Sequence, residues 1–398
     1  MKLKLISTLF IIKIVISLLP FGLYKIIAHN YTQEVFGYFQ YIMSFTVFVS
    51  LLEAGVVSSF RNSVVLEDGD IETEFFRAIK FSLYSIVVIS PCAFVISNFV
   101  FDSSIISLSF SILPLALLCS VFQSYYDLKK RSLLPRLADA IFYSLSIVIS
   151  IKLAYDSVNI AVVFFTMCFG RIVWFIPVFI YQQSELRKYH GENILYLYNN
   201  VHIKLSHLFE NVSFLSLQTL NILYSMLFAY SLMKSVGMAD FASFSLYQKF
   251  FLIPTMLYGM ISPILWIWVG KRFHVWSNSL KIKLVAILFI ALIMFFFFFC
   301  SLINPLISIY VGDKFVLDKS LVFVIGGYYM LSLIRDFLST VLNSQRGYKI
   351  QILSMAIFCI VTMLFLLQDN ASFICFILAQ LFVMALSICF YLYNLKNK

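Results

Sequence analysis

The sequence predicts an all-α polytopic membrane protein of about twelve transmembrane helices, on the evidence of its composition and its apolar runs. Hydrophobic residues make up 62% of the chain, charged residues make up only 12%, and the mean hydropathy is +0.94. A soluble domain carries roughly 25% charged residues. Many apolar runs, such as residues 284–303, approach the ~20 residues that cross a hydrocarbon core. Runs this continuous also exclude a membrane β-barrel, whose strands alternate apolar and polar residues.

The apolar runs divide the chain into two sets of six predicted spans. We expect helices over residues 5–27, 36–57, 78–101, 105–122, 138–155 and 158–181, and then over residues 208–233, 242–269, 282–303, 320–342, 350–367 and 372–393. Because a removed signal peptide would end in a small-residue cleavage site, which the first span lacks, we interpret that span as a retained helix.

The distribution of lysine and arginine predicts the orientation. With both termini placed in the cytoplasm, the outer loops hold only Lys234, Lys314 and Lys319, whereas most other basic residues fall in inner loops. This asymmetry is what the positive-inside rule requires. The net charge of +10 is therefore interpreted as a topology signal and not as a nucleic-acid surface.

The longest predicted inner connection falls at the middle of the chain and suggests two lobes. We expect an N-terminal six-helix lobe over residues 1–181, a cytoplasmic or interfacial linker over 182–207, and a C-terminal six-helix lobe over 208–398. The two halves contain weakly similar segments, such as Phe36-Gly37-Tyr38-Phe39 and Phe241-Ala242-Ser243-Phe244. Because both halves begin inside, they are predicted to be parallel repeats, an arrangement typical of transporters that rock about a central site.

Short motifs at the span ends occur in the order found in one transporter family. They are Glu34-Val35-Phe36-Gly37-Tyr38, Leu51-Leu52-Glu53-Ala54-Gly55-Val56, Asn304-Pro305-Leu306, Tyr310-Val311-Gly312-Asp313-Lys314-Phe315 and Leu342-Asn343-Ser344-Gln345-Arg346-Gly347. With these motifs the whole chain resembles the Wzx-type flippases of O-antigen and exopolysaccharide synthesis, within the multidrug/oligosaccharidyl-lipid/polysaccharide exporter superfamily.

The resemblance implies a function, a location and partners. Its cargo would be a polyprenyl-diphosphate-linked oligosaccharide, flipped across the bacterial inner membrane by alternating access for O-antigen or other lipopolysaccharide and surface polysaccharide synthesis. Besides this substrate and the membrane lipids, the resemblance implies a polysaccharide polymerase and a chain-length regulator as partners, and no nucleic acid.

Charges inside the predicted spans are the candidate site residues, because a charge at the bilayer centre costs at least ~2.5–3.5 kcal/mol. Lys13, Arg171, Lys249 and Arg335 are candidates for lining a cationic substrate lumen. The alternative is structural: Arg171 could pair with Glu53 or Asp139, and Arg335 could cap helix carbonyls. The two carboxylates could likewise carry a coupling proton or form ion pairs.

Two further features complete the predicted site. Asp336 lies about 100° around the helix from Arg335, so we expect the two side chains to face different neighbours. Span eight holds Pro254, Gly259 and Pro263, which make it the candidate for a bending gate. Static kinks fitted to packing are the alternative.

No residue pattern indicates a cofactor, a metal site or an enzyme. The five histidines lie in loops without a metal-ligand arrangement, and there is no phosphate-binding Gly-Lys-Ser/Thr loop. The acidic stretch from Glu67 to Glu74 is interpreted as a solvated loop. Two alternative functions remain: an integral-membrane polysaccharide polymerase, which should show a sizeable basic outer loop, and a multidrug exporter of the same superfamily, which should show deep acidic residues.

Overall fold

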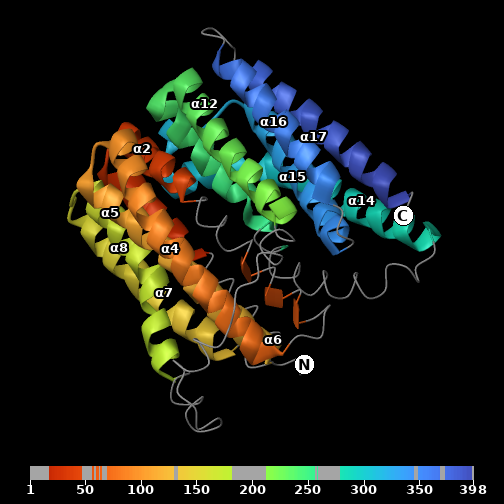
Figure 1. Ribbon diagram of the computed structural model, residues 1–398. Helices are drawn as coiled ribbons and strands as arrows, with labels where there is room; N and C mark the ends of the chain where they lie inside the picture. Colours follow the sequence, from red (N-terminus) through yellow and green to blue (C-terminus); the bar gives the residue numbers. More distant parts are fainter. Residues whose placement is uncertain are drawn as a thin grey trace. The chain divides into compact units, whose positions relative to one another are not determined.

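The computed structural model is helical throughout the residues that it describes (Figure 1). These are residues 18–46, 56–57, 60–61, 63–64, 70–129, 133–181, 212–255, 258, 278–344, 348–367 and 373–396. Within these ranges there is no β-strand, as the sequence predicted.

Eight helices of the described ranges are long and apolar enough to cross a membrane. They are Ile71–Phe101, Ser104–Leu128, Pro135–Tyr155, Ile160–Tyr181, Thr219–Thr255, Lys319–Leu342, Lys349–Leu366 and Cys375–Tyr393. The chain is therefore a multi-pass membrane protein. The total of twelve spans and the cytoplasmic placement of both termini stay predictions.

The chain divides into two compact units, which we call unit 1 and unit 2. Unit 1 comprises Met1–Tyr31 and Phe45–Gln218, and unit 2 comprises Thr32–Ser44 and Thr219–Lys398. Helix α2 (Gln33–Phe45) therefore belongs almost entirely to unit 2, although it comes from the first part of the chain. The linker predicted at residues 182–207 lies outside the described residues.

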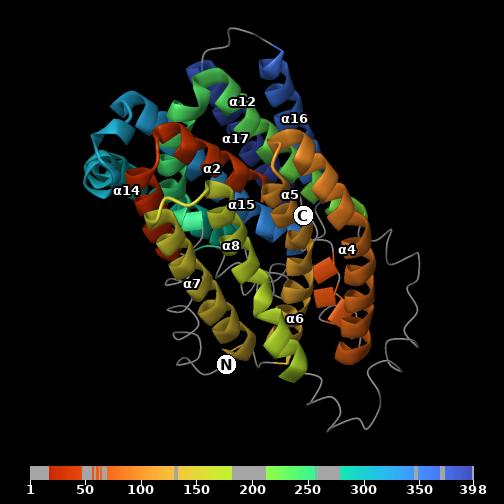
Figure 2. The same cartoon turned by 90° about the vertical axis from the view of Figure 1, so that its left-hand side faces the viewer.

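Unit 1 is built from α4 (Ile71–Phe101), α5 (Ser104–Ile112), the 3-10 turn η1 (Leu113–Leu115), α6 (Ala116–Leu128), α7 (Leu133–Tyr155) and α8 (Ile160–Val173). Helices α7 and α8 lie side by side in both views (Figures 1 and 2). Gly170 permits this close packing, because a Cβ atom there would lie 2.0 Å from the Cβ of Ser146. The rings of Phe75, Phe122 and Tyr125 form a buried aromatic cluster between α4 and α6.

Unit 2 contains α2, α12 (Val212–Phe251, from Thr219 onward), α14 (Asn278–Val311), the 3-10 turn η3 (Asp313–Phe315), α15 (Lys319–Ser344), α16 (Tyr348–Leu366) and α17 (Phe373–Lys396). Helix α15 packs on α14, α16 and α17. Helix α15 therefore lies between other helices of the unit, and the polar residues on its inner face are largely enclosed by protein.

Helix α12 is a helical hairpin rather than one straight helix. Gly237 has φ +79° and ψ 170°, values that interrupt the helix and favour glycine. The rings of Phe228 and Phe244 lie 6.2 Å apart, although a straight helix would separate these positions by roughly 24 Å. The chain therefore reverses at Gly237, between the predicted spans 208–233 and 242–269.

Two of the sequence motifs meet where α2 packs in unit 2. The Gln33 side chain donates to the Ala239 carbonyl at 3.0 Å and to Ser243 Oγ at 3.2 Å. The ring of Phe36 packs edge-on against Phe315 of the motif that follows α14, with centroids 5.5 Å apart. The backbone of α2 approaches closely enough that a Cβ atom on Gly37 would lie 2.1 Å from the Met238 carbonyl oxygen.

Gly37→Ala is expected to destabilise the protein by about 1–3 kcal/mol, because the backbone of α12 must move to admit the methyl group. Gly22→Ala is the matched control, since its Cβ would meet only Ile151 Cδ1 at 3.6 Å, an ordinary contact. Alanine is the better helix former, so the control should be neutral or slightly stabilising. Thermal unfolding of the purified protein measures both; equal unfolding temperatures would show that α2 does not pack as described.

Candidate functional site

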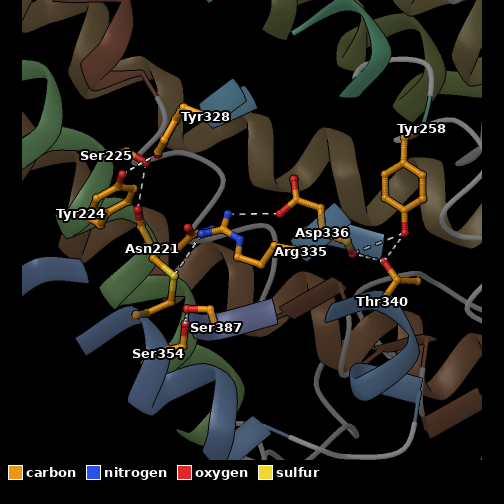
Figure 3. A network of polar contacts seen from close by, with 11 residues as sticks. Asn221, Tyr224, Ser225, Tyr258, Tyr328, Arg335, Asp336, Thr340, Ser354 and Ser387 are labelled. Carbon is orange, nitrogen blue, oxygen red and sulfur yellow. Dashed lines mark hydrogen bonds and ion pairs between the residues drawn. The ribbon is translucent and has the colours of Figure 1, made fainter. Parts of the chain in front are cut away.

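Arg335, near the middle of α15, is a predicted site residue whose contacts the structure describes in detail. Its side chain is only 11% exposed. The guanidinium donates from Nη2 to Asp336 Oδ1 at 3.1 Å (Figure 3). It also donates from Nη1 to Met355 Sδ at 3.6 Å, and it lies over the Phe358 ring, 5.6 Å from the centroid. Because a sulfur is a weak acceptor and a guanidinium has five N–H donors, the described residues leave most of its donor capacity unused.

The expectation that Arg335 and Asp336 face different neighbours was wrong. Their Cα–Cβ bonds diverge as neighbouring helical positions must, but the long arginine side chain bends back to its own neighbour. The Asp336 side chain is 32% exposed, roughly three times as much as that of Arg335. The pair therefore has one enclosed partner and one partly exposed partner.

Tyrosine hydroxyls surround this ion pair, and the sequence could not single them out. Tyr224 of α12 and Tyr328 of α15 are both buried and share a hydrogen bond between their hydroxyl groups. Tyr258 donates to Thr340 Oγ1 at 2.6 Å and to the Asp336 carbonyl at 3.4 Å (Figure 3). Hydrogen bonds thus fix the turn of α15 that carries the charges.

Uncharged polar side chains continue the site along α16 and α17. Ser354 and Ser387 share a hydrogen bond at 2.5 Å, and Gln380 Nε2 donates to Thr362 Oγ1 at 2.9 Å. All four side chains are buried. Gln380 Oε1 has no hydrogen-bond partner among the described residues, so the site contains one unsatisfied buried acceptor.

For the other predicted site residues, the structure describes the surroundings only in part. Lys249 in α12 and Asp139 in α7 are half-buried and have interaction partners, and Pro254 is half-buried in a helical segment just after α12. The backbone of Arg171 lies in α8, but its side chain lies outside the described part, as do Lys13, Glu53, Gly259 and Pro263. The cationic lumen and the bending gate therefore stay predictions.

A second charged cluster joins helix ends of unit 1. Arg136 contacts both carboxylate oxygens of Asp127, at 3.2 and 3.0 Å, and Arg61 lies 3.6 Å from the same carboxylate. Lys129 contacts Glu72 at 2.5 Å. Burial alone would lower the pKa of the Lys129 ammonium, but its hydrogen bonds to Glu72 and Tyr125 outweigh this effect and raise the pKa.

This cluster corrects the expectation of a solvated acidic loop from Glu67 to Glu74. The last four residues of that stretch form the first turn of α4, with Asp70 as the N-cap. Glu74 pairs with Arg77 and accepts from Ser63 Oγ at 3.0 Å. The negative charges are favourable at a helix N-terminus and neutralise nearby basic residues, which the local sequence did not reveal. In the described residues, no group of three or more His, Cys, Asp or Glu could hold a metal ion.

These features define a class: a multi-pass helical membrane protein with a buried charged network in its C-terminal unit. Neither a protein-family model nor a curated protein sequence matches the chain. Solved structures do match it over nearly its whole length. An inward-facing multidrug resistance MATE family transporter of the MOP superfamily has a TM-score of 0.65 at 10% sequence identity, with 98% of each chain covered.

Two more solved structures extend the comparison. The lipid II flippase MurJ, in an inward closed conformation, has a TM-score of 0.66 at 16% identity, covering 98% of this chain and 87% of MurJ. A MOP superfamily transporter from Pyrococcus furiosus Vc1 (DSM3638), whose reverse polarity of the binding pocket suggests a different function, has a TM-score of 0.65 at 9% identity, covering 98% of this chain and 94% of that one. The chain therefore has the fold of MOP-superfamily transporters, as the superfamily resemblance implied.

Asp70→Ala is expected to lower the stability of unit 1 by about 1 kcal/mol at neutral pH, because the Asp70 carboxylate accepts from the Thr73 N–H at 2.9 Å. This hydrogen bond lowers the pKa of Asp70 from its ordinary value of 3.8. A lowered folded-state pKa stabilises above the unfolded-state pKa, and the benefit is lost as pH falls through the folded-state pKa.

The difference in unfolding temperature between the wild type and Asp70→Ala should therefore be full at pH 7 and shrink below about pH 4. Asp156→Ala serves as a control, because its exposed pair with Lys152 should contribute little. A difference that persists unchanged at pH 3 would contradict the capping role.

Proposed function

We propose that the chain is a flippase that moves polyprenyl-diphosphate-linked oligosaccharides across the bacterial inner membrane by alternating access, for O-antigen or other surface polysaccharide synthesis. The observation that carries this proposal is the enclosed guanidinium of Arg335, which keeps most of its donors unused by the described residues. The fold supports it at the level of a transporter.

A diphosphate is the cargo group that such an arginine suits. Arg335 lies roughly 14 Å from the end of α15 at Ser344, so it stands well inside a span. An anion carried through a low-dielectric region needs an opposite charge and hydrogen bonds to offset the lost hydration. The planar guanidinium fork provides both, because it can bind two phosphate oxygens at once.

The remaining candidates extend the proposed path. Lys13, Arg171 and Lys249 add positive charge in other spans, and Glu53 and Asp139 are proposed as coupling or ion-pairing carboxylates. Pro254, Gly259 and Pro263 are proposed to let their span bend during transport. MurJ, with 16% sequence identity to this chain, is a lipid II flippase. This likeness supports the choice of a lipid-linked cargo.

A multidrug exporter is the second candidate, and the fold supports it equally. The partly exposed carboxylate of Asp336 is the observation in its favour, since a cationic drug would bind to a reachable negative charge. The two candidates differ in which member of the Arg335–Asp336 pair contacts the cargo. A polymerase has less support, because the matching solved structures are transporters.

Arg335→Gln is expected to lower surface polysaccharide at least about tenfold in cells that depend on this chain, and Arg335→Lys to retain part of it. The single neutralisation also leaves Asp336 unpaired, so it should destabilise the protein. The double variant Arg335→Gln/Asp336→Asn removes both charges and should regain thermal stability without regaining polysaccharide display.

The double variant separates binding from packing. Recovery of both stability and display would show that the pair is only structural, which would overturn the proposal. Recovery of stability alone is the predicted result. Immunoblotting of the membrane fraction must show equal protein levels, and Asp156→Asn controls for the loss of one negative charge elsewhere.

A further inference from the structure

We propose that Asp336 is an internal counter-ion, which occupies the anion-binding position on Arg335 until the diphosphate of the cargo displaces it. This inference rests on the proposed function and assigns Asp336 a part in it: Asp336 would set how tightly the site holds an anion and how readily it lets the anion go.

The geometry of the pair is that of a replaceable partner. The two residues are joined by one contact, from Arg335 Nη2 to Asp336 Oδ1 at 3.1 Å. The strong form of an arginine–carboxylate pair has two parallel N–H···O bonds, one from each of two guanidinium nitrogens. The single contact at Arg335 engages one N–H donor of the guanidinium, so a ligand that binds at two points would form the stronger pair.

The side chains of Arg335 and Asp336 differ in how closely the protein encloses them. Arg335 is held against Phe358 and Met355 and is 11% exposed, whereas Asp336 is 32% exposed. Tyr258 and Thr340 both donate to the Asp336 backbone carbonyl, so the helix turn stays fixed while the carboxylate can rotate. Displacement therefore needs one short, partly exposed side chain to rotate and needs no movement of α15.

The arrangement also explains how the empty site tolerates a buried cation. Without cargo, Asp336 neutralises Arg335 and spares the cost of an unpaired charge in an apolar region. A diphosphate carries more negative charge than one carboxylate and can accept hydrogen bonds from more of the N–H donors of Arg335. It can therefore displace the Asp336 carboxylate. Once the cargo departs, the carboxylate returns. A neutral or cationic ligand gains nothing from Arg335 and leaves the pair intact.

Binding of farnesyl diphosphate to the full-length protein in nanodiscs, followed by isothermal titration calorimetry, tests this role. Removing the competitor with Asp336→Asn should tighten the dissociation constant about fivefold. Asp336→Glu, which keeps the charge and extends its reach, should weaken binding. Asp156→Asn should leave binding unchanged and so exclude a general charge effect.

Arg335→Gln and Arg335→Gln/Asp336→Asn complete the set and separate the two claims. One outcome overturns the counter-ion role alone: Arg335→Gln loses binding, but Asp336→Asn binds no more tightly than the wild type while its unfolding transition is unchanged. The flippase proposal would then still stand. If Arg335→Gln binds as tightly as the wild type, the anion site itself is overturned. In the predicted result, the double variant binds no better than Arg335→Gln.

Discussion

The cost of leaving a polar group unpaired in an apolar interior governs this molecule. In lipid, backbone groups must bond within the protein, which is why the described residues fold almost wholly into helices. The same cost applies to buried polar side chains. In unit 2 these side chains bond to one another: Tyr224 to Tyr328, Ser354 to Ser387, and Arg335 to the adjacent Asp336. In an ion pair such as Arg335–Asp336, an anionic ligand can replace the carboxylate without leaving the buried cation unpaired.

Glycine sets the close contacts on which each unit depends. In unit 1, Gly170 brings α8 against Ser146 of α7, and in unit 2, Gly37 brings α2 against the backbone of α12. Gly237 has a different part, because its positive φ reverses the chain and makes α12 a hairpin. The first two contacts set the distance between α7 and α8 and between α2 and α12.

The sequence predicted those features that depend on average properties along the chain. Hydropathy located the helices, and the break between residues 233 and 242 falls where Gly237 turns. The motifs at Phe36 and Phe315 also proved to be structural, since their rings pack together. Such features can be predicted without knowledge of tertiary contacts, because local composition and residue spacing encode them.

The candidate site was predictable only in part, because it depends on contacts between distant segments. The cost of burying Arg335 marked it as a site residue, but helical periodicity suggested that Asp336 would point elsewhere. The reach of a flexible arginine side chain decides that question. Tyr224 and Tyr328 were not distinguishable among 23 tyrosines until the helices that carry them were packed. The first turn of α4 was missed because ion pairs with distant basic residues stabilise it.

Cargo movement in a defined membrane tests the central claim most directly. The purified protein would be reconstituted into liposomes that contain a fluorescent polyprenyl-diphosphate oligosaccharide, and the fraction open to an added glycosidase would be followed over time, with and without imposed ion gradients. The account predicts protein-dependent exposure of this anionic cargo and no transport of a lipophilic cation. Transport of the cation, with no exposure of the oligosaccharide by demonstrably folded protein, would contradict the flippase proposal and favour a multidrug exporter.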